Sequence, residues 1–99
     1  MPALKWNQEL HNIAMGHCVN MATGKVPFGH DGFHQRSQMV TFYKIAFAEN
    51  VAYNMGCADC VRTAVDGWIH SPGHRKNLLG NFSKCGIAVF CHYGKFYFT

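Results

Sequence analysis

The sequence has no long hydrophobic run. None of its apolar stretches approaches the ~20 residues that span a bilayer, so we expect no membrane-spanning segment. Residues 1–20 also lack the pattern of a signal peptide, because polar residues interrupt each apolar stretch. Repeats and low-complexity segments are missing as well. With 99 residues, the chain is expected to form one small domain over residues 1–99.

Charge is also scarce, at 14% of residues. Nine basic and five acidic side chains give a net charge of +4, and Arg75-Lys76 is the only adjacent basic pair. Nucleic-acid binders usually carry a clustered basic stripe, often with interleaved aromatic residues. We therefore expect no nucleic-acid partner, while the mild positive charge favours contact with acidic surfaces.

Cysteine, in contrast, is abundant, with Cys18, Cys57, Cys60, Cys85 and Cys91. This count favours an oxidising compartment, and the odd number leaves at least one thiol unpaired or intermolecular. If residues 85–91 form one strand, Cys85 and Cys91 lie roughly 20 Å apart and cannot be partners. The Cys57-x-x-Cys60 motif either closes a small loop or supplies half of a metal site. Without a second C-x-x-C motif, a four-cysteine zinc ribbon is excluded.

Apolar residues at three- and four-residue steps predict a first helix from Asn7 to about Thr23. Asn7 is its expected cap and Gly24 its expected end. A short helix is predicted over residues 33–39, capped by Asp31. Another is predicted over residues 60–70, capped by Asp59.

The remaining segments predict a small sheet. Residues 43–53 are either a short strand or an irregular buried turn, and residues 54–56 are expected to form a turn. Residues 85–92 are apolar on both faces, as in a covered central strand. Tyr93-Gly94 then predicts a hairpin, and residues 95–99 the return strand. Helices on both sides of a small antiparallel sheet would cover the apolar strand, which makes an α+β fold.

One stretch, Trp68 to Leu79, combines apolar residues with a sharp helix break. The helix carrying Trp68 should stop at Ser71-Pro72-Gly73, which places His74 just past the corner, directed toward a cleft. Two further stretches, residues 28–33 and 48–52, each frame one ionisable side chain with apolar residues. These side chains are His30 and Glu49.

These motifs, taken in order, resemble the CAP superfamily, the SCP-type domains of cysteine-rich secretory proteins, antigen 5 and pathogenesis-related proteins. The matching segments are Leu4-Lys5-Trp6, residues 29–33, Glu49-Asn50-Val51-Ala52, residues 68–79, residues 86–89 and residues 96–99. The bacterial and protist members are the most similar. Such domains usually begin with another helix ahead of Pro2-Ala3-Leu4 and continue past Thr99, so the chain resembles a domain trimmed at both ends.

The resemblance implies an α-β-α sandwich with a central cleft lined by two histidines and acidic groups. Carried over by motif, the histidines are His30 and His74, and the carboxylate is Glu49. The second acidic position of many eukaryotic members falls near His70-Ser71, where this chain has no carboxylate.

Two imidazoles and a carboxylate that converge suit a divalent ion such as Zn²⁺. We therefore predict a metal site at His30 and His74, with Glu49 and His70 as further ligands and zinc not required for folding. The same three residues, His30, Glu49 and His74, are the candidates for a metal-dependent hydrolase. However, the Glu of an H-E-x-x-H motif is missing, and Pro72-Gly73 interrupts the helix that such a motif needs.

A structural role is the competing interpretation for several motif residues. Glu49 would then accept buried backbone hydrogen bonds, and Asn50 and Asn77 would fix turns. Pro72 and Gly73 would shape the corner, and Trp68 would pack in the core together with Phe28 and Phe33.

The favoured function is a secreted-type binding or interaction module without dedicated enzymatic activity. The family resemblance implies a sterol, fatty-acid or protein ligand, a role in defence or host interaction, and an extracellular or secretory-lumen location. The alternatives are a metal-dependent hydrolase and a structural subunit of a larger assembly.

Overall fold

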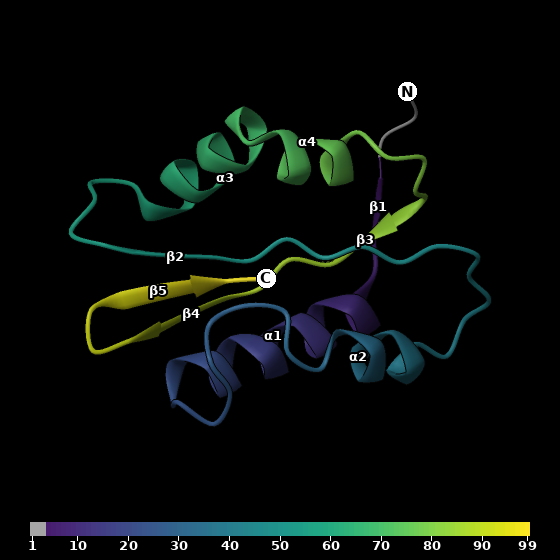
Figure 1. The fold of residues 1–99 in the computed structure, drawn as a ribbon, viewed down its shortest axis with the longest axis horizontal. Coiled ribbons are helices and arrows are strands. Elements are labelled where there is room, and N and C mark those ends of the chain that lie inside the picture. Colours follow the sequence, from purple (N-terminus) through teal and green to yellow (C-terminus); the bar gives the residue numbers. More distant parts are fainter. Residues whose placement is uncertain (1–3) are drawn as a thin grey trace.

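A computed structural model describes residues 4–99 of the chain, which form three layers (Figure 1). A small sheet lies in the middle. Helices α3 (Cys60–His70) and α4 (Pro72–Leu78) lie on one side of it, and α1 (Gln8–Ala22) and α2 (Phe33–Met39) on the other. The predicted α+β class and the α-β-α sandwich are confirmed.

Two sheets make up the middle layer. Strands β2 (Ala52–Met55), β5 (Lys95–Phe98) and β4 (Val89–His92) form an antiparallel sheet in the order β2-β5-β4. Strands β1 (Lys5–Trp6) and β3 (Lys84–Cys85) form a short parallel pair at the other end (Figure 1). The central strand of the three-stranded sheet is therefore β5, the last strand in the sequence.

The first helix begins and ends as its sequence predicts. The Asn7 side chain accepts a hydrogen bond from the Leu10 N–H at 2.9 Å, which satisfies one of the unpaired donors at the helix start. After the helix, Gly24 adopts φ 76°, a left-handed conformation that glycine takes without a steric penalty. Local signals alone therefore determine this element.

The predicted caps of the other two helices have different outcomes. Asp59 accepts a hydrogen bond from the Arg62 N–H at 3.1 Å, so the prediction for α3 is confirmed. The prediction that Asp31 caps α2 is wrong. The capping position is Gly32, at φ 82°, and no side chain caps this helix. The helix starts at Phe33 as predicted, but the left-handed Gly32 stands between it and Asp31 and takes the capping position.

Two predictions about the strands are wrong. Asn54 and Met55 belong to β2, opposite Phe96 and Lys95, so the turn begins at Gly56 and not at Asn54. Residues 85–92 do not form one central strand, because the segment divides into β3 and β4, which lie in different sheets. The break begins at Gly86, which passes so close to α1 that a Cβ atom there would lie 2.2 Å from the His11 backbone nitrogen. For residues 43–53 the sequence left open a short strand or an irregular turn. The structure has both, because this segment is irregular up to Val51 and extended from Ala52.

The hairpin prediction is confirmed. Tyr93 and Gly94 both have positive φ angles, 50° and 78°, as a tight turn between antiparallel strands requires. Beyond the return strand, Ala88 and Thr99 exchange two backbone hydrogen bonds of 3.0 and 3.2 Å. This pairing brings the end of the chain beside the segment that precedes β4.

Each face of the three-stranded sheet has its own small core. On one side, Ala14 and Cys18 of α1 pack with Ala88. On the other, Ala64 and Trp68 of α3 pack with Phe98 of β5. Because β5 is central and covered by α3, Phe98 is one of the two largest fully buried side chains. The core prediction is confirmed for Trp68 but is wrong for Phe28 and Phe33, whose side chains are exposed.

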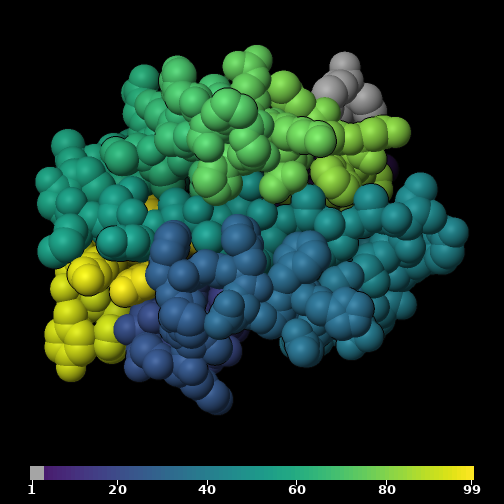
Figure 2. Space-filling view, viewed as in Figure 1, coloured from purple at the N-terminus to yellow at the C-terminus, as the bar shows by residue number. Residues whose placement is uncertain are grey.

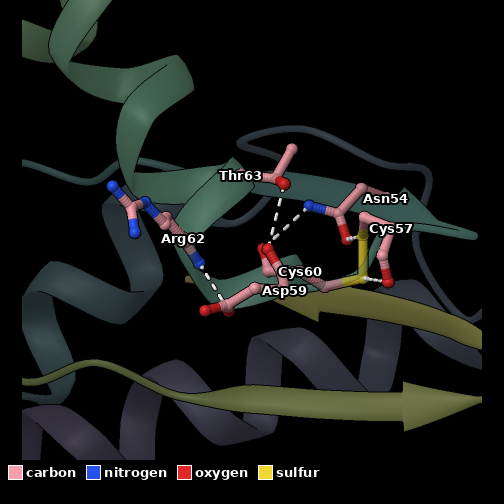
Figure 3. The surroundings of a disulfide bond; sticks show 6 residues. All are labelled: Asn54, Cys57, Asp59, Cys60, Arg62 and Thr63. Carbon is pink, nitrogen blue, oxygen red and sulfur yellow. Dashed lines mark hydrogen bonds between the residues drawn. A yellow bond between two sulfur atoms is a disulfide. The ribbon is translucent and has the colours of Figure 1, made fainter.

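The C-x-x-C motif closes a loop at the start of α3 (Figure 3). Cys57 and Cys60 form a disulfide with a Cα–Cα distance of 5.3 Å. The Asn54 side chain donates to the Cys60 carbonyl at 3.1 Å, so the loop is also tied to β2. The alternative of a half metal site is thereby excluded in this oxidised form. Cys18, Cys85 and Cys91 are free thiols.

Among residues 4–99, no helix has the length and apolar character needed to cross a membrane.

Candidate functional site

The helix break at residues 71–73 leads directly into a second helix and not into a loop. Helix α3 ends at His70 as predicted, but Pro72 and Gly73 are the first residues of α4. Proline suits this position, because the first turn of a helix has no partner for its N–H groups and φ is already near the helical value. His74 therefore lies past the end of α3, as predicted, but in the first turn of a new helix, α4, which the sequence did not predict.

His74 is held by short-range and long-range contacts. Its Nδ1 lies 2.9 Å from the Ser71 hydroxyl, at the residue that precedes α4. Its backbone carbonyl accepts a 3.1 Å hydrogen bond from the Asn50 side chain. The motif around Glu49 is thus connected to α4 through the neighbour of Glu49 in sequence.

Asn77, one turn further along α4, completes this connection. Its side-chain NH₂ donates to the Asn50 Oδ1 at 2.9 Å and to the Glu49 carbonyl at 3.3 Å. Both bonds cross between segments more than 25 residues apart in sequence. The two asparagines therefore fasten the irregular chain before β2 to the helix that carries His74.

The Glu49 carboxylate is the centre of an ion-pair cluster. Arg36 Nε donates to Oε2 at 2.6 Å, and Arg36 Nη2 donates to Oε1 at 2.7 Å. His30 Nδ1 lies 2.8 Å from the same Oε1. The side chains of Arg36 and Glu49 are 9% and 5% exposed, whereas that of His30 is 50% exposed. A buried charge is expected to be paired in this way.

Arg36 is the residue of this cluster that the sequence interpretation missed. Its guanidinium also donates to the Asp31 carbonyl at 2.6 Å and to the His30 carbonyl at 3.3 Å. Arg36 therefore folds the loop that carries His30 back onto the start of α2. The sequence did contain a hint of this pair. Arg36 is the one lysine or arginine in α2, and Glu49 follows a largely apolar stretch. Isolated opposite charges in apolar surroundings are candidates for a buried pair.

His70 lies outside this cluster. Its Nδ1 contacts the Asp66 carbonyl one turn earlier in α3, at 2.7 Å, and the side chain is exposed. Trp68 instead faces the sheet, where its indole N–H donates to the Val51 carbonyl at 3.1 Å. The structure thus joins His30 with Glu49 directly, and His74 with Glu49 only through the asparagines.

The side chains in this region do not fit a metal ion well. Across residues 4–99, no three His, Cys, Asp or Glu side chains are grouped so that they could hold one. Glu49 has both oxygens engaged by a guanidinium, whose positive charge opposes a second cation at the same carboxylate. Zinc at His30 and His74 stays a prediction.

A second histidine supports the loop that carries His30. His17 of α1 is only 2% exposed, and its Nε2 lies 2.7 Å from the Gly29 carbonyl. A carbonyl only accepts, so the Nε2 atom carries the proton. Burial lowers the pKa of His17 below its usual value, because removal from water disfavours the imidazolium.

An apolar cavity of about 350 Å³ lies beside the ion-pair cluster. Its walls come from α1, the irregular segment 42–50, helices α3 and α4, and residues 81–87. Apolar side chains dominate the lining, among them Leu10, Ile13, Phe42, Phe47 and Phe82. Glu49, Asn50 and Asn77 form part of its polar lining, which also includes Lys44, Asn81, Ser83, Lys84 and Thr99.

A shallow, open hollow borders the same wall. It is lined by His30, Phe33, Phe47, Ala48, Glu49 and Asn77. Four of these residues, Phe47, Ala48, Glu49 and Asn77, also line the cavity. The side chains around Glu49 therefore separate a half-exposed histidine on the surface from an apolar interior space.

Comparison with known proteins identifies relatives of the whole chain. The family model described as "CAP: Cysteine-rich secretory protein family" matches residues 1–99. The Bacillus subtilis membrane protein YlbC is 28% identical over 102 aligned residues. That match covers 87% of this chain but 25% of YlbC, so the chain spans a quarter of that relative.

Solved structures show the same fold. An extracellular protein containing an SCP domain from Bacillus anthracis has 25% identity and a TM-score of 0.55, covering 99% of this chain and 33% of that one. A cysteine-rich secretory protein from Staphylococcus aureus has 24% identity and a TM-score of 0.57, with 99% and 31% covered. An outer surface protein from Borrelia burgdorferi, at 13% identity, has a TM-score of 0.61, with 99% and 76% covered. The last two likenesses concern the fold alone.

Proposed function

The chain belongs to the cysteine-rich secretory protein (CAP) family, and we propose that it acts as a binding module for a small apolar ligand outside the cytosol. The ligand class is a fatty acid or a sterol. The observation that carries this proposal is the cavity of about 350 Å³ with its mostly apolar lining. Ligand pockets typically enclose roughly 300–1,000 Å³, with apolar walls and a few polar groups that orient the ligand.

The polar groups of the cavity suit an apolar ligand with a small polar end. Asn50 and Asn77 are oriented by their own hydrogen bonds, so they are fixed in place before a ligand arrives. The Glu49 charge at this wall is already neutralised by Arg36. At this wall a hydroxyl or protonated carboxyl group would thus meet fixed dipoles and a neutralised carboxylate. Lys44 and Lys84, which also line the cavity, would suit an ionised carboxylate.

Two observations support a location outside the cytosol. The Cys57–Cys60 disulfide is of a kind that persists in oxidising compartments. In addition, the Bacillus anthracis relative is an extracellular protein. The hydrolase alternative has less support, because Arg36 occupies both oxygens of the carboxylate that would activate water.

Competition with a fluorescent fatty-acid analogue tests the proposal. Oleate and cholesterol would serve as competitors. Ile13→Trp places a larger side chain on the cavity wall, whereas Asn12→Trp makes the same change at an exposed neighbour that does not line the cavity. We expect Ile13→Trp to lose binding and Asn12→Trp to keep it, with similar melting temperatures. If the parent binds neither competitor, or both variants bind alike, this proposal is wrong.

A further inference from the structure

The part of the cavity wall farthest from the hairpin is a strongly exposed apolar loop. We use this name for residues 42–47, Phe-Tyr-Lys-Ile-Ala-Phe. Its Tyr43 and Ile45 side chains are each 89% exposed, although both also border the cavity. A tyrosine and an isoleucine exposed to this degree on one short loop form an apolar surface that water solvates poorly.

The apolar loop is held firmly at both ends. Before it, the Thr41 N–H donates to the Glu9 carboxylate of α1 at 2.7 Å. After it, Glu49 is fixed by the buried pair with Arg36. The exposed side chains therefore project from an anchored base, and their exposure does not come from an unattached chain.

Lysines accompany the apolar loop. Lys44 belongs to it, and the Lys84 ammonium lies over the Phe42 ring, 4.7 Å from its centroid. Lys5 lies opposite Lys84 in the parallel pair of β1 and β3. Glu49 is neutralised by Arg36, whereas the Glu9 carboxylate bonded to Thr41 keeps its charge. Three lysines against this one carboxylate leave a net positive charge at this end.

We propose that this end of the molecule docks on an anionic lipid bilayer, with Tyr43 and Ile45 entering the boundary between headgroups and acyl chains. Aromatic residues favour this boundary, and nearby lysines bind anionic headgroups while their stems stay in apolar surroundings. The loop forms part of the cavity wall, so docking would bring the cavity next to the lipid that contains the ligand. The inference rests on the proposed apolar-ligand function, but it concerns a separate set of contacts.

Figure 1 shows how the arrangement permits this contact. The segment between α2 and β2 forms one end of the molecule, near β1 and β3, while the turn between β4 and β5 forms the opposite end. Figure 2 shows the same segment as the outer edge on that side. The loop can therefore meet a flat surface without interference from the hairpin.

Sedimentation with phospholipid vesicles tests the inference. The parent would be compared on vesicles of phosphatidylcholine alone and on vesicles with added phosphatidylglycerol. We expect binding to the anionic vesicles, and Tyr43→Ser/Ile45→Ser to weaken it by about tenfold or more, because two apolar side chains no longer enter the lipid. The matched control is Tyr93→Asn in the opposite turn, which removes a 93% exposed aromatic side chain.

The charge contribution is tested separately. Lys5→Gln/Lys84→Gln should weaken binding to anionic vesicles by about fivefold per lysine and leave the weak binding to phosphatidylcholine unchanged. Lys25→Gln/Lys95→Gln removes two charges away from this end, one after α1 and one beside the turn between β4 and β5, and should have little effect. The inference is overturned if Tyr43→Ser/Ile45→Ser binds like the parent, or if Tyr93→Asn loses as much binding.

The outcomes also separate this inference from the proposed function. If the parent binds the fatty-acid analogue in solution but no vesicle, the docking surface is wrong and the cavity proposal stands. If the parent binds vesicles through the apolar loop but no analogue, docking is supported and the cavity proposal falls.

Discussion

Arg36 and Glu49 form a two-bond ion pair that lies almost entirely out of water. The two N–O distances are 2.6 and 2.7 Å, and the side chains are 9% and 5% exposed. The pair connects α2 to the chain before β2, and through Asn50 and Asn77 it reaches α4. It therefore holds together the segments that border the cavity.

Replacement of Arg36 by methionine should destabilise the protein strongly. Methionine has a similar length but leaves the Glu49 charge buried without its partner, which costs about 3–5 kcal/mol. Arg62→Met is the matched control, because Arg62 pairs with Asp66 at 3.9 Å on the surface, with side chains 80% and 57% exposed. We expect the control to change the free energy of unfolding by at most about 1 kcal/mol. Urea unfolding measures both, and equal small losses would contradict the structural role of Arg36.

The stability of the protein should depend on His17 below pH 6.5. Burial lowers the pKa of His17 in the folded state below its usual value of 6.5. Between those two pKa values the unfolded chain binds more protons, so the free energy of unfolding decreases as the pH falls. Above pH 6.5 this contribution is fully present.

Comparison of His17→Gln with His34→Gln isolates this effect. Glutamine keeps an N–H donor for the Gly29 carbonyl but does not titrate. The exposed His34 serves as the control. Denaturant unfolding at pH 7.5 and pH 5.5 should show a smaller difference in stability between the two pH values for His17→Gln than for the parent. A pH dependence that His17→Gln leaves unchanged would refute this assignment.

Loss of the Asn77 amide should loosen the connection between α4 and the Glu49 segment. Asn77→Ala removes two hydrogen bonds and leaves the Asn50 Oδ1 and the Glu49 carbonyl without these donors. The expected loss is about 1–3 kcal/mol in the free energy of unfolding. Asn12→Ala, at an exposed position of α1, should cost much less. Faster hydrogen exchange in residues 48–51 of Asn77→Ala would identify the segment that is released.

The three free thiols should react with iodoacetamide in an order set by burial. Cys91 is exposed and should be alkylated first, followed by the half-buried Cys85. Cys18 is completely buried, and burial raises the pKa of its thiol, so little of the reactive thiolate is present. Mass spectrometry of timed samples gives the order. Early labelling of Cys18 in the folded protein would contradict the packing of α1 against Ala88.

The sequence motifs around Glu49, Asn77 and His74 located the site region but not its partners. His30 and Glu49 were expected together, and they are in contact. Arg36, the strongest partner of Glu49, was not anticipated, because its role depends on which face of α2 turns toward residues 48–51. His70 was a candidate ligand, yet its Nδ1 bonds to the Asp66 carbonyl of its own helix and its side chain is exposed.

The helices were largely determined by the sequence itself. Periodic apolar residues, the capping side chains of Asn7 and Asp59, and Gly24 act within a few residues of one another, so the ends of α1 and α3 follow from local chemistry. The positive φ angles of the hairpin at Tyr93-Gly94 are equally local.

Tertiary structure decided the rest, because the deciding contacts join distant parts of the chain. Residues 85–92 look like one strand, but Gly86 is pressed against α1, so the chain leaves one sheet and enters another. The buried Arg36–Glu49 pair spans 13 residues, and the cavity has walls from segments spread over most of the sequence. Local pattern specifies which elements form, whereas only packing between them specifies which charges are buried together and where space is left.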